Sequence, residues 1–179
     1  YMEYQGIASE EEILSMYKNK TAKYTVEGPL HLGALLAGAR EDILVGLSAY
    51  AIPIGIAFQI QDDILGIFGT SERLGKPAQS DIVEGKITLL VSRALRDGTP
   101  EQQARIKTIL ALGDTLTDAD SKEFQRLIEI TGAKESAQQL AQTYIAEGLQ
   151  SLEKIREKLD PQTYTFLVSV AEYMLKRAY

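Results

Sequence analysis

The sequence contains no cysteine and only one histidine. Without cysteine the chain has no disulfide framework and no thiolate metal site, and a reducing, cytoplasmic location is the natural expectation. A single histidine also excludes a metal site built from several imidazole groups. The side chains that remain available for chemistry are carboxylates, lysines, hydroxyls and amides.

The chain also lacks an excess of positive charge and long apolar runs. Its net charge is −6, which argues against general nucleic-acid binding. The densest apolar run, YAIPIGIAF, is too short to cross a bilayer, so we expect no membrane span. The N-terminus is neither basic nor followed by an apolar core, so no cleavable signal is visible.

What the sequence has is helical periodicity in nearly every segment. The 179 residues, 45% of them hydrophobic, suit one globular domain covering residues 1–179. We predict helices over 9–25, 29–69, 87–98, 99–113, 118–132, 133–159 and 161–179, with a break at Gly28-Pro29 and a polar loop over 70–86. No strand-like alternation of useful length occurs, so the predicted fold class is all-α, packed as a helical bundle.

The stretch FQIQDDILGIFG places two adjacent carboxylates, Asp62 and Asp63, in the most apolar part of the chain. On a helix, Gln59, Asp62, Asp63 and Gly66 share one face. Mutual repulsion, burial and the negative end of the helix dipole all disfavour the charged pair. A hard cation such as Mg²⁺ relieves all three and bridges carboxylates to phosphate oxygens. The ordinary alternative is a solvated surface pair.

Lysines around this stretch suggest an anion beside the metal. Lys20 falls on the apolar stripe predicted for the first helix, where it either snorkels to solvent or points into a pocket. The stripe is predicted to comprise Ile13, Met16, Tyr17 and Tyr24. The loop after the carboxylates adds Lys76, Asp81 and Lys86 among glycines, which allow close approach to a phosphate. Together these residues predict a metal–diphosphate site.

Three motifs resemble those of the trans-isoprenyl diphosphate synthases, such as the geranylgeranyl and farnesyl diphosphate synthases. FQIQDDILGIFG is similar to their second aspartate-rich motif, NKTA to their Lys-Thr motif, and GKPAQSDIVEGKIT to the flap segment that follows. The motifs occur in the family's order and at similar spacing, and the resemblance covers the whole chain. It implies a helical bundle of the isoprenoid synthase type.

The resemblance also implies a prenyltransferase that joins an allylic diphosphate to isopentenyl diphosphate through an allylic carbocation, with Mg²⁺ as cofactor. It implies that Asp62 binds the metal directly and that Asp63 and Asp81 support the metal. The same resemblance gives Thr21 and Gln59 an orienting role. Lys20, Lys76 and Lys86 are implied to hold diphosphate oxygens.

Two departures from the family pattern stand out. Gly66 occupies the place of the motif's third aspartate, and no first aspartate-rich motif occurs in the chain. The sequence therefore resembles a C-terminal portion that lacks the N-terminal helices. We expect that alone it is inactive, exposes an apolar face around Ile56, Phe58 and Leu65, and forms a homodimer or larger assembly. The alternatives are a non-catalytic subunit of a heteromeric synthase and a class I terpene cyclase.

Overall fold

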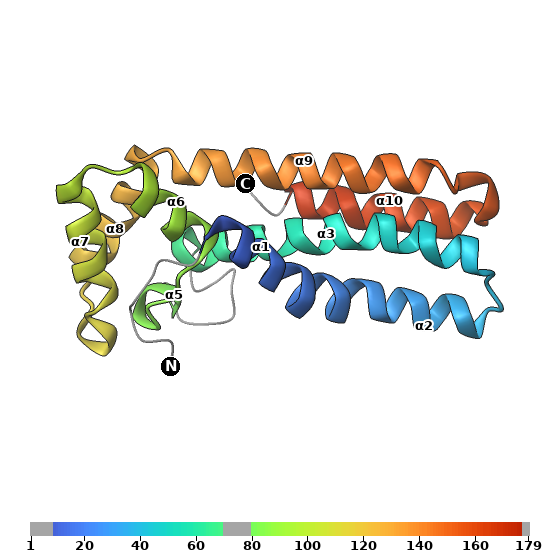
Figure 1. Ribbon diagram of the computed structural model, residues 1–179, viewed down its shortest axis with the longest axis horizontal. Helices are drawn as coiled ribbons and strands as arrows, with labels where there is room; N and C mark the ends of the chain where they lie inside the picture. Colours follow the sequence, from blue (N-terminus) through green and yellow to red (C-terminus); the bar gives the residue numbers. More distant parts are fainter. Residues whose placement is uncertain (1–8, 70–79, 177–179) are drawn as a thin grey trace. The chain divides into compact units, whose positions relative to one another are not determined.

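The computed structural model of the protein describes residues 9–69 and 80–176. Within these ranges the chain forms helices joined by short turns and contains no strand, so the predicted all-α class is confirmed (Figure 1). The helices, in chain order, are α1 (Glu10–Tyr17), the π-helix η1 (Lys18–Glu27), α2 (Gly28–Leu36), α3 (Glu41–Phe68), α5 (Ser80–Val83), α6 (Leu89–Asp97), α7 (Pro100–Leu110), the short η2 (Gly113–Thr115), α8 (Asp118–Ile130), α9 (Ala133–Glu153), the short η3 (Arg156–Lys158) and α10 (Pro161–Lys176).

The chain divides into two compact units. We call one the motif unit, which comprises the residues up to Ile13 and Asp62–Gln138. The other is the bundle unit, which comprises Leu14–Gln61 and the chain from Gln139 onward. Helices α1, α3 and α9 each contribute residues to both units. The expectation of a single domain over residues 1–179 stays a prediction.

Close contacts between helices hold the bundle unit together. Figure 1 shows α3, α9 and α10 side by side. A Cβ built on Gly148 of α9 would lie 2.8 Å from the Ile54 side chain of α3. Tyr50, wholly buried in α3, donates its hydroxyl hydrogen to the Leu167 carbonyl of α10 over 2.7 Å. Burial raises the pKa of the Tyr50 phenol, which therefore stays neutral as a donor.

Two predicted helix limits, at the start and at the end of α2, are wrong. The predicted break at Gly28-Pro29 is wrong, because Gly28 is right-handed helical and η1 passes directly into α2. Pro29 fits there because the first turn of a helix needs no donor from it. The interruption comes instead at Gly38, whose φ of 75° lies in the left-handed region that favours glycine. One predicted helix over 29–69 is therefore two helices.

Helix caps set the boundaries in the motif unit. Thr99 and Gln102 form a reciprocal capping box at α7, and Thr117 and Asp120 form another at α8. Arg105 of α7 reaches the Asp120 carboxylate over 2.9 Å and Glu123 over 2.6 Å, which ties α7 to α8. The helices predicted over 99–113 and 118–132 are found there.

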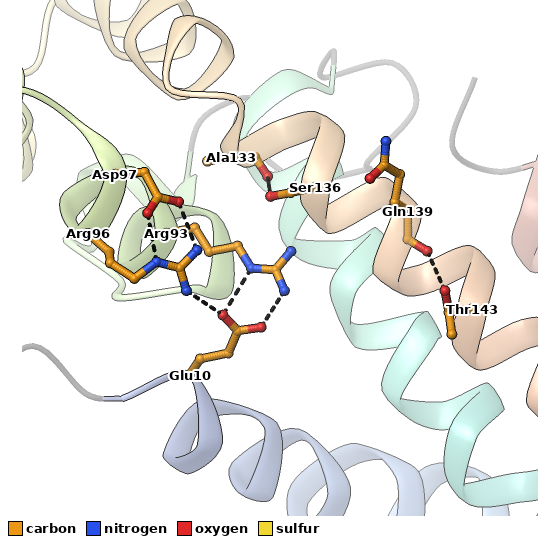
Figure 2. A network of polar contacts seen from close by, with 8 residues as sticks. All are labelled: Glu10, Arg93, Arg96, Asp97, Ala133, Ser136, Gln139 and Thr143. Atoms are coloured by element: carbon orange, nitrogen blue, oxygen red, sulfur yellow. Dashed lines mark hydrogen bonds and ion pairs between the residues drawn. The ribbon is translucent and has the colours of Figure 1, made fainter.

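A charged cluster joins α1 to α6 in the motif unit (Figure 2). The Glu10 carboxylate accepts from Nε of Arg93 at 3.2 Å and from Nη1 of Arg96 at 3.0 Å, and it also pairs with Nη2 of Arg93. Arg93 is only 8% exposed, so Glu10 neutralises a cation that water hardly reaches. The hydrogen bond from Arg93, against the effect of burial, lowers the pKa of Glu10 below its ordinary value.

The exposed apolar surface differs from the expectation. Ile56 is buried, and Phe58 and Leu65 are half-buried, so the predicted apolar face around them is wrong for Ile56. Exposed large apolar side chains of the bundle unit include Leu32, Leu35 and Leu36 of α2 and Val45 of α3.

By length and composition alone α3 is long enough to cross a membrane, a test that a buried core helix also passes.

Candidate active site

The last two turns of α3 carry the paired carboxylates. Asp62 is exposed, whereas Asp63 is buried at 5% exposure. Because the helix ends at Phe68, both groups lie in the region where the helix dipole repels anions, as the sequence predicts. Of the two, Asp62 is the one whose carboxylate can reach a ligand in solvent.

The flap segment brings Asp81 and Lys86 together in the motif unit. Asp81 lies in the first turn of α5, and Lys86 Nζ lies 2.6 Å from its Oδ1 and 3.0 Å from Oε2 of Glu84. Burial acts to lower the pKa of Lys86, but the hydrogen bonds to Asp81 and Glu84 outweigh it and raise that pKa above its ordinary value. Lys86 is therefore a firmly charged ammonium.

Gly85 makes this ion pair possible. Its φ of 61° reverses the chain, and the Lys86 amide donates to the Asp81 carbonyl over 3.0 Å. The reversal places the two side chains, five residues apart, within contact distance. Asp81 is held at 12% side-chain exposure, while Lys86 keeps 47%.

The bundle unit brings together Thr21 and Gln59. The Thr21 hydroxyl donates to Oε1 of Gln59 over 2.6 Å, and Thr21 is 7% exposed. The contact depends on Gly55, four residues before Gln59, because a Cβ there would lie 2.4 Å from Cα of Ala22. The absent side chain lets η1 approach α3 closely enough for the hydrogen bond.

Lys20 is exposed, which corrects its predicted place on an apolar stripe. Met16 and Tyr24, also predicted for that stripe, are 47% and 82% exposed. The chain changes from α-helical to π-helical hydrogen bonding at Lys18, which widens each turn. The buried positions therefore run Ile13, Tyr17, Thr21 and Ala22. Long π-helical segments are uncommon and often accompany functional sites.

The predicted metal ligands do not form a ready-made site. Among residues 9–69 and 80–176, no three acidic or imidazole groups are gathered closely enough to hold a metal ion. Lys76 lies outside the described residues. The oxygen donors of Asp62, Asp63 and Asp81 are nonetheless the kind that Mg²⁺ takes. Their chemistry therefore fits Mg²⁺, and they offer part of a ligand set.

Sequence reasoning missed several buried polar groups, among them Arg93 and Gln61. Arg93 stands in an apolar run, ITLLVSRALRDG, and its charge there was a signal of a buried partner. Gln61 is 2% exposed, and its Oε1 has no hydrogen-bond partner in the part of the chain that the structure describes. Helical spacing set Gln59 apart from Gln61, but no signal in the sequence predicted an unpaired amide oxygen at Gln61.

Comparison with known proteins decides the family. Residues 2–131 match the family model described as "Polyprenyl synthetase". The chain belongs to the polyprenyl synthetase family. The match covers the aspartate pair, the Lys-Thr motif and the flap segment, so the predicted family is confirmed.

Individual relatives agree with the family match. A short chain isoprenyl diphosphate synthase of Methanothermobacter thermautotrophicus is 34% identical over 169 residues, which are 94% of this chain and 50% of the relative. The heptaprenyl diphosphate synthase component 2 of Geobacillus stearothermophilus is 35% identical and is covered over 49% of its length. This chain thus spans about half the length of these polyprenyl synthetases.

A solved structure supports the fold. The geranylgeranyl pyrophosphate synthase of Corynebacterium glutamicum, crystallised with isoprenyl diphosphate and magnesium, aligns with a TM-score of 0.88 at 35% identity. The alignment covers 94% of this chain and 47% of that protein. The isoprenoid synthase type of helical fold, predicted from the motifs, is confirmed.

Proposed function

We propose that this chain is the portion of a Mg²⁺-dependent prenyltransferase that carries the second aspartate-rich motif. The reaction joins an allylic diphosphate to isopentenyl diphosphate and gives a longer trans-prenyl diphosphate. The observation that carries the proposal is the exposed Asp62 beside the buried Asp63, in the last two turns of a family-matched α3. An exposed carboxylate held where the helix dipole opposes it is well placed for a cation.

The reaction breaks the allylic carbon–oxygen bond, and the electron pair leaves with the diphosphate. The double bond of isopentenyl diphosphate then attacks the allylic cation, a carbon–carbon bond forms, and a proton is lost. Bound Mg²⁺ would stabilise the negative charge that builds up on the departing diphosphate. The chain's own contribution is fixed positive charge and fixed orientation.

Each residue has a distinct part in that contribution. Asp62 offers a carboxylate oxygen to the metal, while Asp63 and Asp81 support it. Lys86, kept charged by its pairing with Asp81, is suited to hold a diphosphate oxygen, as are Lys20 and Lys76. The hydrogen bond from Thr21 fixes the amide of Gln59, which orients the polar side of α3.

One observation favours a particular second candidate, a component of a heteromeric synthase. The Geobacillus relative is named as component 2 of its enzyme, and the present sequence contains no first aspartate-rich motif. In such a synthase another subunit would supply further metal-binding carboxylates. Because this chain keeps the aspartate pair, its part in such an assembly is catalytic.

A homodimer and a cytoplasmic location remain proposals. Sedimentation tests the homodimer, and cell fractionation tests the location.

Binding tests the proposal without requiring a complete active site. Farnesyl diphosphate is titrated into the 179-residue chain by calorimetry, with and without Mg²⁺. We expect Mg²⁺-dependent binding that Asp62→Asn weakens about tenfold or more, since about 1.4 kcal/mol accompanies each factor of ten. Asp114→Asn, at an exposed position of η2, is the matched control and should bind as the parent does.

Two outcomes overturn the assignment. One is equal binding in the presence and absence of Mg²⁺, and the other is equal affinity in Asp62→Asn and the parent. A terpene cyclase is tested separately in the assembled enzyme, because a cyclase converts the allylic substrate without isopentenyl diphosphate.

A further inference from the structure

Gly66 has a neighbour that leaves no room for a side chain. A Cβ built on Gly66 would lie 2.2 Å from Oδ2 of Asp81 and 2.7 Å from its Cγ. Non-bonded carbon and oxygen atoms keep well over 3 Å apart, so the two groups cannot share this space. The Asp81 carboxylate therefore occupies the place that any side chain at position 66 would need.

Backbone conformation does not account for the glycine. Gly66 is buried inside α3, and its φ is not among the positive ones. Glycine in a helix interior is less favourable than alanine, because it loses more conformational freedom on folding. Gly33, inside α2, has nothing within 4 Å of its built Cβ, which shows that helical glycines in this chain do not all mark a close contact.

We propose that Gly66 is a positioning residue that admits the flap carboxylate of Asp81 to the face of α3 carrying the aspartate pair. Position 66 follows Asp62 by four residues and Asp63 by three, so the three positions share one helix face. Asp81 thereby takes the place of the third carboxylate that the motif lacks. The inference rests on the proposed function and adds how the flap and the motif fit together.

The contacts of Asp81 explain how it keeps this place. Its Oδ1 accepts from Lys86 Nζ at 2.6 Å, while Oδ2 is the oxygen that lies against Gly66. The turn at Gly85 and the hydrogen bond from the Lys86 amide to the Asp81 carbonyl fix the backbone below it. One oxygen is thus paired with the lysine and the other is turned toward α3.

The substitution Gly66→Ala tests whether the absence of a side chain at position 66 makes room for the Asp81 carboxylate. It should weaken Mg²⁺-dependent binding of farnesyl diphosphate about tenfold and lower the melting temperature, although alanine is the better helix former. Gly33→Ala is the matched control and should change neither quantity for the worse. Equal affinity and equal or higher melting temperature in Gly66→Ala would overturn the inference.

A double-mutant cycle distinguishes displacement of Asp81 from a general packing defect. In the Asp81→Ala background the space beside position 66 is open, so adding Gly66→Ala should no longer lower the melting temperature. An equal loss in both backgrounds would mean that Gly66 acts through other neighbours, and the inference would fail. The cycle is read from melting curves, so it needs no catalytic activity.

Moving the carboxylate from position 81 to position 66 tests whether Asp81 takes the place of the motif's third aspartate. Asp81→Ala should weaken Mg²⁺-dependent binding, and adding Gly66→Asp to it should recover at least part of the lost affinity. No recovery in the folded double variant would overturn the replacement role. If Asp62→Asn weakens binding but Gly66→Ala and Asp81→Ala do not, the proposed function stands and only this inference fails.

Discussion

The hydrogen bond between Thr21 and Gln59 joins η1 to α3 in the bundle unit. Its length of 2.6 Å and the burial of Thr21 mean that water cannot replace the hydroxyl easily. We expect Thr21→Val to lower the free energy of unfolding by about 1–2 kcal/mol, because the half-buried amide oxygen of Gln59 loses this donor. Denaturant unfolding followed by circular dichroism measures the change.

The control for this prediction is Thr143→Val in α9. Its hydroxyl also donates, to the Gln139 carbonyl over 3.0 Å, but the residue is exposed. Substitutions at such positions change stability by no more than about 0.5 kcal/mol. An equal loss of unfolding free energy in both variants would show that burial of Thr21 adds nothing to the strength of its hydrogen bond.

The pairing of Glu10 with Arg93 predicts a pH dependence. Arg93, against burial, lowers the pKa of Glu10 below its ordinary value of 4.5. Stability from this carboxylate is thus fully present above pH 4.5 and is lost as pH falls through the lower folded pKa. Glu10→Gln should cost about 1–3 kcal/mol near neutral pH. The deficit should shrink as pH falls from 4.5 toward 3.

Melting curves at several pH values measure this deficit directly. Glu11→Gln, at the exposed neighbouring position, provides the control and should show no such convergence. A deficit of Glu10→Gln that stays constant from pH 7 to pH 3 would contradict the assigned charge pairing.

At the scale of elements, the approach of η1 to α3 depends on Gly55. A methyl group there would lie 2.4 Å from Cα of Ala22 and 2.6 Å from its Cβ, and backbone cannot move aside as a flexible side chain can. We expect Gly55→Ala to destabilise the fold by about 1–3 kcal/mol, the range for an overpacked core. The variant should also loosen the Thr21–Gln59 contact, which amide hydrogen exchange would detect.

Gly33→Ala is the counterpart in α2. With nothing within 4 Å of the added methyl, the substitution should stabilise the helix by about 0.5–1 kcal/mol. The two glycines therefore predict opposite signs for the same chemical change. A similar response in both would show that helix propensity, not close packing, governs Gly55.

At the scale of the whole molecule, these 179 residues should not make prenyl diphosphates by themselves. The described part of the chain gathers no three metal-binding groups, and the sequence has no first aspartate-rich motif. Groups that act as a unit lose far more than the sum of single deletions when one half is absent. Incubation with Mg²⁺, isopentenyl diphosphate and farnesyl diphosphate, followed by product extraction, tests this expectation. Turnover of about 1 s⁻¹ or more, ordinary for enzymes, would contradict it.

The sequence by itself determined the all-α class, most helix starts and the family. Local rules suffice for these features, since a capping box such as Thr117 with Asp120, or the spacing of Gln59, Asp62 and Asp63, is written within a few residues. The three motifs, which occur in the family's order, indicated the class of function for the same reason. The roles of Gln59, Asp62 and Asp63 as site residues stay predictions.

Only the tertiary structure decided which residues meet. The change to π-helical hydrogen bonding at Lys18 left Lys20 exposed, although an α-helical repeat from Tyr17 places Lys20 on the buried stripe. The burial of Arg93 beside Glu10 and the place of Asp81 against Gly66 likewise depend on partners distant in the sequence. Long-range packing selects among conformations that local propensity leaves nearly equal in energy, and that selection is absent from any short stretch of sequence.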